Sequence, residues 1–118
     1  MKIILPILFI FILSTSSLQA DNKVDLINLY KELHANPELS FKEEKTSKKL
    51  ATILRDLGLE VTENFGGYGV IALFRNGEGK TIMLRADMDG LPVEELTGAP
   101  YASKTKSFNQ VGDEVFTM

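Results

Sequence analysis

Two carboxylates, Asp87 and Asp89, stand two residues apart, and Arg85 precedes them at the same spacing. In an extended chain such residues project to one side, so the two carboxylates would share a face. They would repel each other unless a metal ion or the guanidinium of Arg85 lay close by. The alternative is purely structural, because an Asp ahead of Gly-Leu-Pro can bond to nearby backbone amides and shape a turn.

The residues before this polar cluster indicate how it is positioned. Ile82, Met83 and Leu84 form a short apolar run of the kind found in a strand buried on both faces. Binding sites in open α/β sheets gather at the carboxyl ends of strands, which is where the carboxylates would lie. A second apolar run covers Val70 to Phe74, and the four residues 76–79 connect it to Thr81. This spacing predicts an antiparallel hairpin that turns at residues 76–79.

Two helices are predicted upstream. The first spans Asn22 to His34, and Asp21 or Asn22 can cap it. Asn36-Pro37 ends it, because the residue before a proline avoids the helical region. The second spans Ser40 to Gly58 and begins with a capping box of Ser40 and Glu43. A short strand is predicted over Leu59 to Thr62, and no regular structure is predicted over residues 91–118.

The composition excludes several classes of function. The chain has 118 residues, enough for one domain, and a net charge of −3, which does not favour nucleic acid as a partner. It has no cysteine and a single histidine, His34, so a histidine-rich zinc site cannot be built from it alone. At a helix end His34 is explained by the helix dipole, and a role in a site is the less favoured reading.

The first twenty residues resemble a secretory signal. Lys2 is followed by an apolar run that ends in small residues and Leu-Gln-Ala, which predicts a signal peptide over residues 1–20 and cleavage after Ala20. The protein would then be exported to the periplasm or secreted, with the membrane involved only through this signal. An uncleaved anchor or a buried helix is the alternative.

A family resemblance rests on two segments, LHANPELSFKEEKTS and RADMDGLPVEE. Together they resemble the amino-terminal part of M20-family metallohydrolases, from about Leu26 to Met118. The branch most similar contains hippurate hydrolases, N-acyl-amino-acid amidohydrolases and plant auxin-conjugate hydrolases. The resemblance implies an α/β fold: the start of an M20-type catalytic domain over residues 21–118, with two helices and then strands of a central mixed sheet that include a β-hairpin.

The resemblance also implies a chemistry. M20 enzymes cleave amide bonds of small N-acyl amino acids with divalent metal ions (Zn, Mn or Co), and full-length members form homodimers. Asp87 stands where many M20 peptidases have a metal-binding histidine, and Asp89 where they have an orienting aspartate. We therefore expect Asp89 to orient the site and Asp87 to support ligand geometry or the local structure. No metal ligand can be assigned within these 118 residues.

The resemblance leaves alternatives for the function. The family's His-x-Cys-Gly-His-Asp segment, which supplies the first metal ligands, does not occur in the sequence. The chain is therefore expected to be an amino-terminal fragment of an exported amidohydrolase and to be inactive alone. It could instead be a non-catalytic exported α/β remnant or binding module, or a fragment of an M20 carboxypeptidase or deacylase. The sequence RADMDGLP favours the amidohydrolase branch over the carboxypeptidases.

Overall fold

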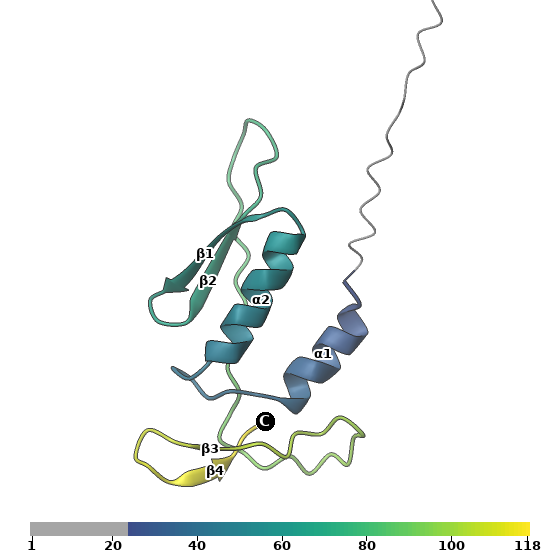
Figure 1. The fold of residues 1–118 in the computed structure, drawn as a ribbon, viewed down its shortest axis with the longest axis vertical. Coiled ribbons are helices and arrows are strands. Elements are labelled where there is room, and N and C mark those ends of the chain that lie inside the picture. The colour runs from purple at the N-terminus through teal and green to yellow at the C-terminus, as the bar shows by residue number, and fades with distance from the viewer. Residues whose placement is uncertain (1–23) are drawn as a thin grey trace, which may run out of the picture.

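The structure is a computed structural model and describes residues 24–118. The predicted signal peptide, its cleavage site, and the candidate caps Asp21 and Asn22 lie outside those residues. None of the described helices is long and apolar enough to cross a membrane. Figure 1 shows the elements in chain order: α1 (Leu26–Ala35), α2 (Glu44–Asp56), β1 (Glu60–Phe65), β2 (Gly69–Leu73), β3 (Lys106–Phe108) and β4 (Glu114–Phe116).

Helix α1 confirms the first predicted helix, although it begins later. Asp25 is its N-cap, and the Asp25 carboxylate accepts a hydrogen bond from the backbone N–H of Asn28 at 3.1 Å. This contact satisfies one of the N–H groups that have no partner within the helix. Asn36 is the C-cap, as the following Pro37 predicts.

Helix α2 confirms the second predicted helix, but the predicted capping box is wrong. The helix begins at Glu44, and its N-cap residue, Glu43, makes no side-chain capping bond. The carboxylate of Glu38 caps the helix instead, accepting from the backbone N–H of Thr46 at 2.7 Å and of Lys45 at 3.2 Å. Ser40 lies three residues before the N-cap, and its hydroxyl donates to Asp89 instead.

The first hairpin pairs β1 with β2 in antiparallel register and packs against α2 (Figure 1). Ala51 on α2 is fully buried, and Gly66 and Gly67 turn the chain with positive φ. The hairpin predicted around residues 76–79 is therefore wrong. Both loops are rich in glycine, and turn chemistry alone does not tell which of them joins paired strands.

The strand predicted over Ile82 to Leu84 is also wrong, because no strand is present there. The side chains of Ile82, Met83 and Leu84 are exposed by 85%, 84% and 94%. Their apolar character predicted burial on both faces, but within residues 24–118 no other segment covers these side chains. The expected central mixed sheet is likewise not formed within these residues, which contain two separate two-stranded antiparallel sheets.

The second of these sheets lies in the segment for which no regular structure was predicted. Strands β3 and β4 pair antiparallel, with Ser107 opposite Val115. Each strand has only three residues, too few for an alternating pattern to be recognised in the sequence. A turn at residues 109–113 closes the hairpin, and the side chain of Asn109 accepts from the backbone N–H groups of Val111 and Asp113.

Candidate functional site

The candidate site is the polar segment Arg85–Asp89, and its first carboxylate is held by its own neighbour. Nη2 of Arg85 donates to Oδ1 of Asp87 at 2.7 Å. Both side chains are mostly exposed, at 79% and 71%. An ion pair in water stabilises little, typically about 0–1 kcal/mol, so this contact orients Asp87 more than it stabilises the fold.

Asp89 is tied to a different part of the chain. Its Oδ2 accepts a hydrogen bond from the hydroxyl of Ser40, in the segment that connects α1 to α2. Its neighbour Gly90 forms a parallel bridge with Leu39, and the N–H of Gly90 donates to the carbonyl of Glu38 at 2.7 Å. Asp87 and Asp89 are only two residues apart in sequence, yet they have different partners.

The backbone around Gly90 is crowded on two sides. Leu91 and Met118 exchange backbone hydrogen bonds, with N···O distances of 2.6 and 2.9 Å. A Cβ added at Gly90 would lie 2.7 Å from Cβ of Pro37 and 3.1 Å from the carbonyl oxygen of Met118. Only glycine at position 90 allows the backbone to lie so close to both Pro37 and Met118. This close approach fixes the position of the neighbouring Asp89.

A second polar cluster, which sequence reasoning missed, joins α1 to the loop of residues 91–104. Nε2 of His34 and Oε2 of Glu95 lie 3.0 Å apart. The side chain of Glu95 is 1% exposed, and that of His34 is 25% exposed. The two residues are 61 positions apart, and no local pattern in the sequence pairs them.

The environment of Glu95 favours its charged form. A hydrogen bond from the hydroxyl of Thr97, then one from His34, lowers the pKa of Glu95, and the backbone N–H of Ser103 adds to the effect. Ser103 donates to Oε2 at 2.5 Å. A carboxylate with several donors is stabilised as the anion in spite of its burial.

The described residues do not form a metal centre. Among residues 24–118, no three His, Asp or Glu side chains lie close enough together to hold a metal ion. Asp87 is paired with Arg85, Asp89 with Ser40, and His34 with Glu95. Structural and catalytic zinc sites use three or four protein ligands, and the described residues bring no three candidate ligands together.

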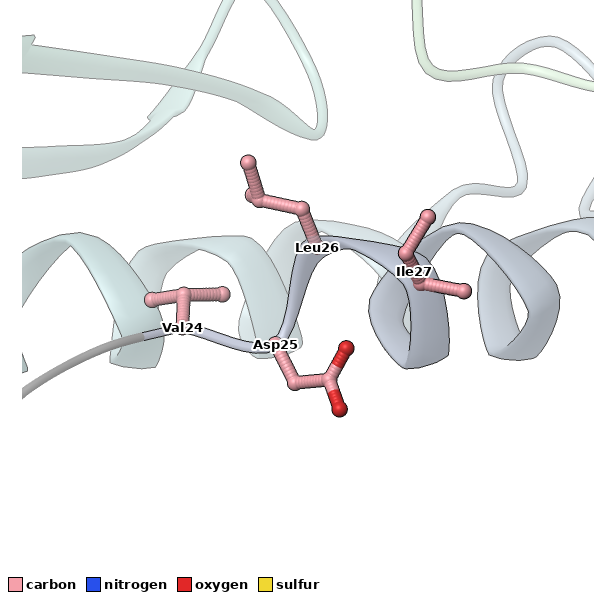
Figure 2. A pocket seen from close by; sticks show the side chains of 4 residues that line it. All are labelled: Val24, Asp25, Leu26 and Ile27. Atoms are coloured by element: carbon pink, nitrogen blue, oxygen red, sulfur yellow. The ribbon is translucent and has the colours of Figure 1, made fainter.

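A recess at the start of α1 lies apart from this chemistry. It is lined by Val24, Asp25, Leu26 and Ile27, and Figure 2 shows the Asp25 carboxylate turned away from the side chains of Leu26 and Ile27. Asp25 already serves as the N-cap of α1. With one occupied carboxylate and no second polar group, the recess lacks the convergent polar groups typical of a binding site.

The chain is similar to known hydrolases over most of its length. It is 49% identical over 83 residues to thermostable carboxypeptidase 2 of Saccharolobus solfataricus, a match that covers 69% of this chain and 21% of the relative. It is 46% identical over 77 residues to the hippurate hydrolase of Campylobacter jejuni, covering 64% of this chain and 20% of that enzyme. No protein-family model matches the chain.

The fold of the chain is also similar to that of a solved structure. The YxeP protein of Bacillus subtilis, a dinuclear metal-binding peptidase of the M20 family, superposes with a TM-score of 0.64 and 38% identity. The match covers 79% of this chain and 24% of that protein. The chain is therefore homologous to M20-family metal-dependent amidohydrolases and peptidases, and it spans about a fifth of the length of the curated relatives it matches.

Proposed function

We propose that this chain is part of a metal-dependent amidohydrolase that cleaves the amide bond of small N-acyl amino acids. The observation that carries the proposal is the 46% identity to a hippurate hydrolase. The segment RADMDGLPVEE, which is similar to the amidohydrolase branch of the family, supports it. A metal supplied with ligands from elsewhere in the enzyme would polarise the amide carbonyl and activate water.

The role proposed for these residues is to orient rather than to react. Ser40 fixes one oxygen of Asp89, and Gly90 anchors the backbone beside it. A carboxylate held in this way can hold a neighbouring ligand at a fixed angle, which is how groups around a metal tune its geometry. Asp87, held by Arg85 on an exposed segment, is proposed to support the local structure.

The test is hydrolysis of N-benzoylglycine by the product of the complete gene. Asp89→Ala is expected to lower the turnover by roughly 10- to 100-fold, the usual effect of removing a group that orients a metal ligand. Asp113→Ala, which removes an exposed carboxylate in the β3–β4 turn, is the matched control and is expected to retain full turnover. Equal turnover of the Asp89→Ala variant and the unmodified enzyme would exclude the orienting role.

A carboxypeptidase is the second candidate, because the 49% identical relative carries that activity in its name. The two functions differ in substrate: an amidohydrolase releases a simple acyl group, whereas a carboxypeptidase releases the last residue of a peptide. Rates on N-benzoylglycine and on an N-blocked dipeptide therefore separate them. Faster hydrolysis of the blocked dipeptide would favour the carboxypeptidase.

The remaining parts of the proposal concern the whole protein. We propose export through a signal peptide over residues 1–20 and a homodimer as the full-length assembly, as the resemblance implies. The sequence Lys2 to Ala20 supports the export signal. Amino-terminal sequencing of the mature protein is expected to begin at Asp21, and a product that begins at Met1 would contradict cleavage.

A further inference from the structure

Glu95 is a buried carboxylate that the proposed hydrolysis does not use. It lies in the loop of residues 91–104, and only 1% of its side chain is exposed. Three donors face it: the hydroxyl of Thr97, the backbone N–H of Ser103 and Nε2 of His34. Thr97 and Ser103 belong to the same loop, whereas His34 lies in the last turn of α1.

The ring of His34 is held in position by aromatic neighbours. Its centroid lies 5.5 Å from that of Tyr101 and 5.7 Å from that of Tyr30, and the His34 and Tyr101 planes meet at 81°. Tyr30 and Tyr101 also contact each other edge to face at 5.8 Å. The loop therefore reaches α1 through one charged contact and a small aromatic cluster.

Hydrogen bonds hold the loop of residues 91–104 at both of its ends. At its start, Leu91 exchanges two hydrogen bonds with Met118. Just after its end, the hydroxyl of Thr105 donates to the carbonyl of Ala35 at 3.3 Å, and the carbonyl of Thr105 accepts from the backbone N–H of Thr117 at 3.0 Å. Movement of the loop away from α1 would disturb both ends of this arrangement.

We propose that Glu95 and His34 form an acid-sensitive latch that fastens the loop of residues 91–104 to α1. While the latch is closed, it holds the paired backbones of Leu91 and Met118 in place. Protonation of Glu95 opens it, because the negative charge of this carboxylate strengthens all three hydrogen bonds. A protonated carboxyl group keeps an acceptor oxygen but loses that charge, so its contacts with the loop and with His34 weaken.

The direction of the pH effect follows from the environment of Glu95. The hydrogen bond from Thr97, followed by that from His34, lowers the pKa of Glu95. The contribution of the latch to stability is therefore complete above the ordinary carboxyl range and is lost as the pH falls through the lowered pKa of Glu95. The latch is closed at neutral pH.

The other described titratable side chains near the pair are two phenols and one ammonium group. From α1, Tyr30 lies beside His34, and Nζ of Lys31 lies 5.9 Å from the ring centroid of Tyr101. The charge interaction with Tyr101 raises the pKa of Tyr30, which moves it further from the acid range. Among the described groups that face the pair, Glu95 is the carboxyl group, and the acid transition of the latch is assigned to it.

The first test is a titration of the 15N-labelled protein from pH 7 to pH 3, followed by NMR. The amide of Ser103, which donates to Glu95, is expected to shift in one step with a midpoint below the ordinary glutamate value. The amides of Leu91 and Met118 are expected to shift with the same midpoint. Shifts of Leu91 and Met118 that are absent, or that follow a different midpoint, would overturn the latch even if Ser103 titrates.

Variants provide the second test, at a fixed pH of 6. Glu95→Gln is expected to raise hydrogen exchange at Leu91 and Met118 by roughly tenfold or more, the equilibrium effect of losing a charged hydrogen bond. Glu94→Gln removes the adjacent exposed carboxylate and is expected to leave exchange unchanged. Unchanged exchange in Glu95→Gln would contradict the proposal.

The histidine side of the latch has its own variant. His34→Gln retains a donor but carries no charge, so it is expected to raise the midpoint of the Ser103 step toward the ordinary glutamate value. An unchanged midpoint would show that His34 does not act on Glu95. If Glu95→Gln does not fold, the titration of the unmodified protein and the His34→Gln midpoint still decide the proposal.

Discussion

Gly90→Ala is expected to lower the free energy of unfolding by about 1–3 kcal/mol, the usual cost of forcing a methyl group into a packed site. The added Cβ would lie 2.7 Å from Cβ of Pro37, closer than carbon atoms approach without displacement. Relief would require moving the backbone that bonds to Glu38 and carries Asp89. Urea denaturation of the two proteins measures the difference.

A double-mutant cycle separates this collision from a general loss of flexibility. Pro37→Gly removes the Cβ that the new methyl group would meet, so Gly90→Ala is expected to cost less in the Pro37→Gly protein than in the unmodified one. The contact with the carbonyl oxygen of Met118, at 3.1 Å, remains in both backgrounds and sets the residual cost. Equal costs in the two backgrounds would show that Pro37 does not set the limit.

Glu38→Ala is expected to lower the free energy of unfolding by about 1–2 kcal/mol, within the range measured for removal of helix caps. The Glu38 carboxylate accepts from two backbone N–H groups at the start of α2 and from the hydroxyl of Thr46 at 2.9 Å. A negative charge at this position also interacts favourably with the positive end of the helix dipole. Urea denaturation, read by the loss of helical circular dichroism, provides the measurement.

Glu43→Ala is the matched control for the cap. Glu43 occupies the N-cap position itself but makes no side-chain capping bond, so its removal is expected to cost at most a few tenths of a kcal/mol. If Glu43→Ala destabilised the protein as much as Glu38→Ala, negative charge near the helix would matter rather than the specific hydrogen bonds of Glu38.

The helices could be predicted from the sequence because their signals are local. Apolar residues at helical spacing identify both helices, and Pro37 marks the end of α1. The cap of α2 could not be predicted, because Glu38 reaches it from outside the helix while the locally favoured Ser40 bonds to Asp89. That choice depends on a contact between residues 49 positions apart.

The sheet was predicted less well for a related reason. Strand pairing depends on which segments meet, and both glycine-rich loops satisfy the chemistry of a turn. The structure pairs β1 with β2 and leaves the apolar residues Ile82, Met83 and Leu84 exposed. Their burial on both faces would require further chain on either side, which no local pattern within these residues specifies.

The candidate site was partly visible in the sequence. The Arg85, Asp87 and Asp89 cluster stands out by residue type and spacing, and Arg85 does supply the positive charge beside Asp87. The bond of Asp89 to Ser40 and the pairing of His34 with Glu95 could not be predicted, since each joins segments brought together only by folding.

Metal dependence of amide hydrolysis tests the proposed function most directly. The product of the complete gene would be assayed on N-benzoylglycine as purified, after removal of metal with a chelator, and after return of zinc, manganese or cobalt. We expect hydrolysis to be lost on chelation and restored by at least one of these ions. Hydrolysis that persists at full rate without metal, or its absence under all three conditions, would contradict the assignment of this chain to a metal-dependent amidohydrolase.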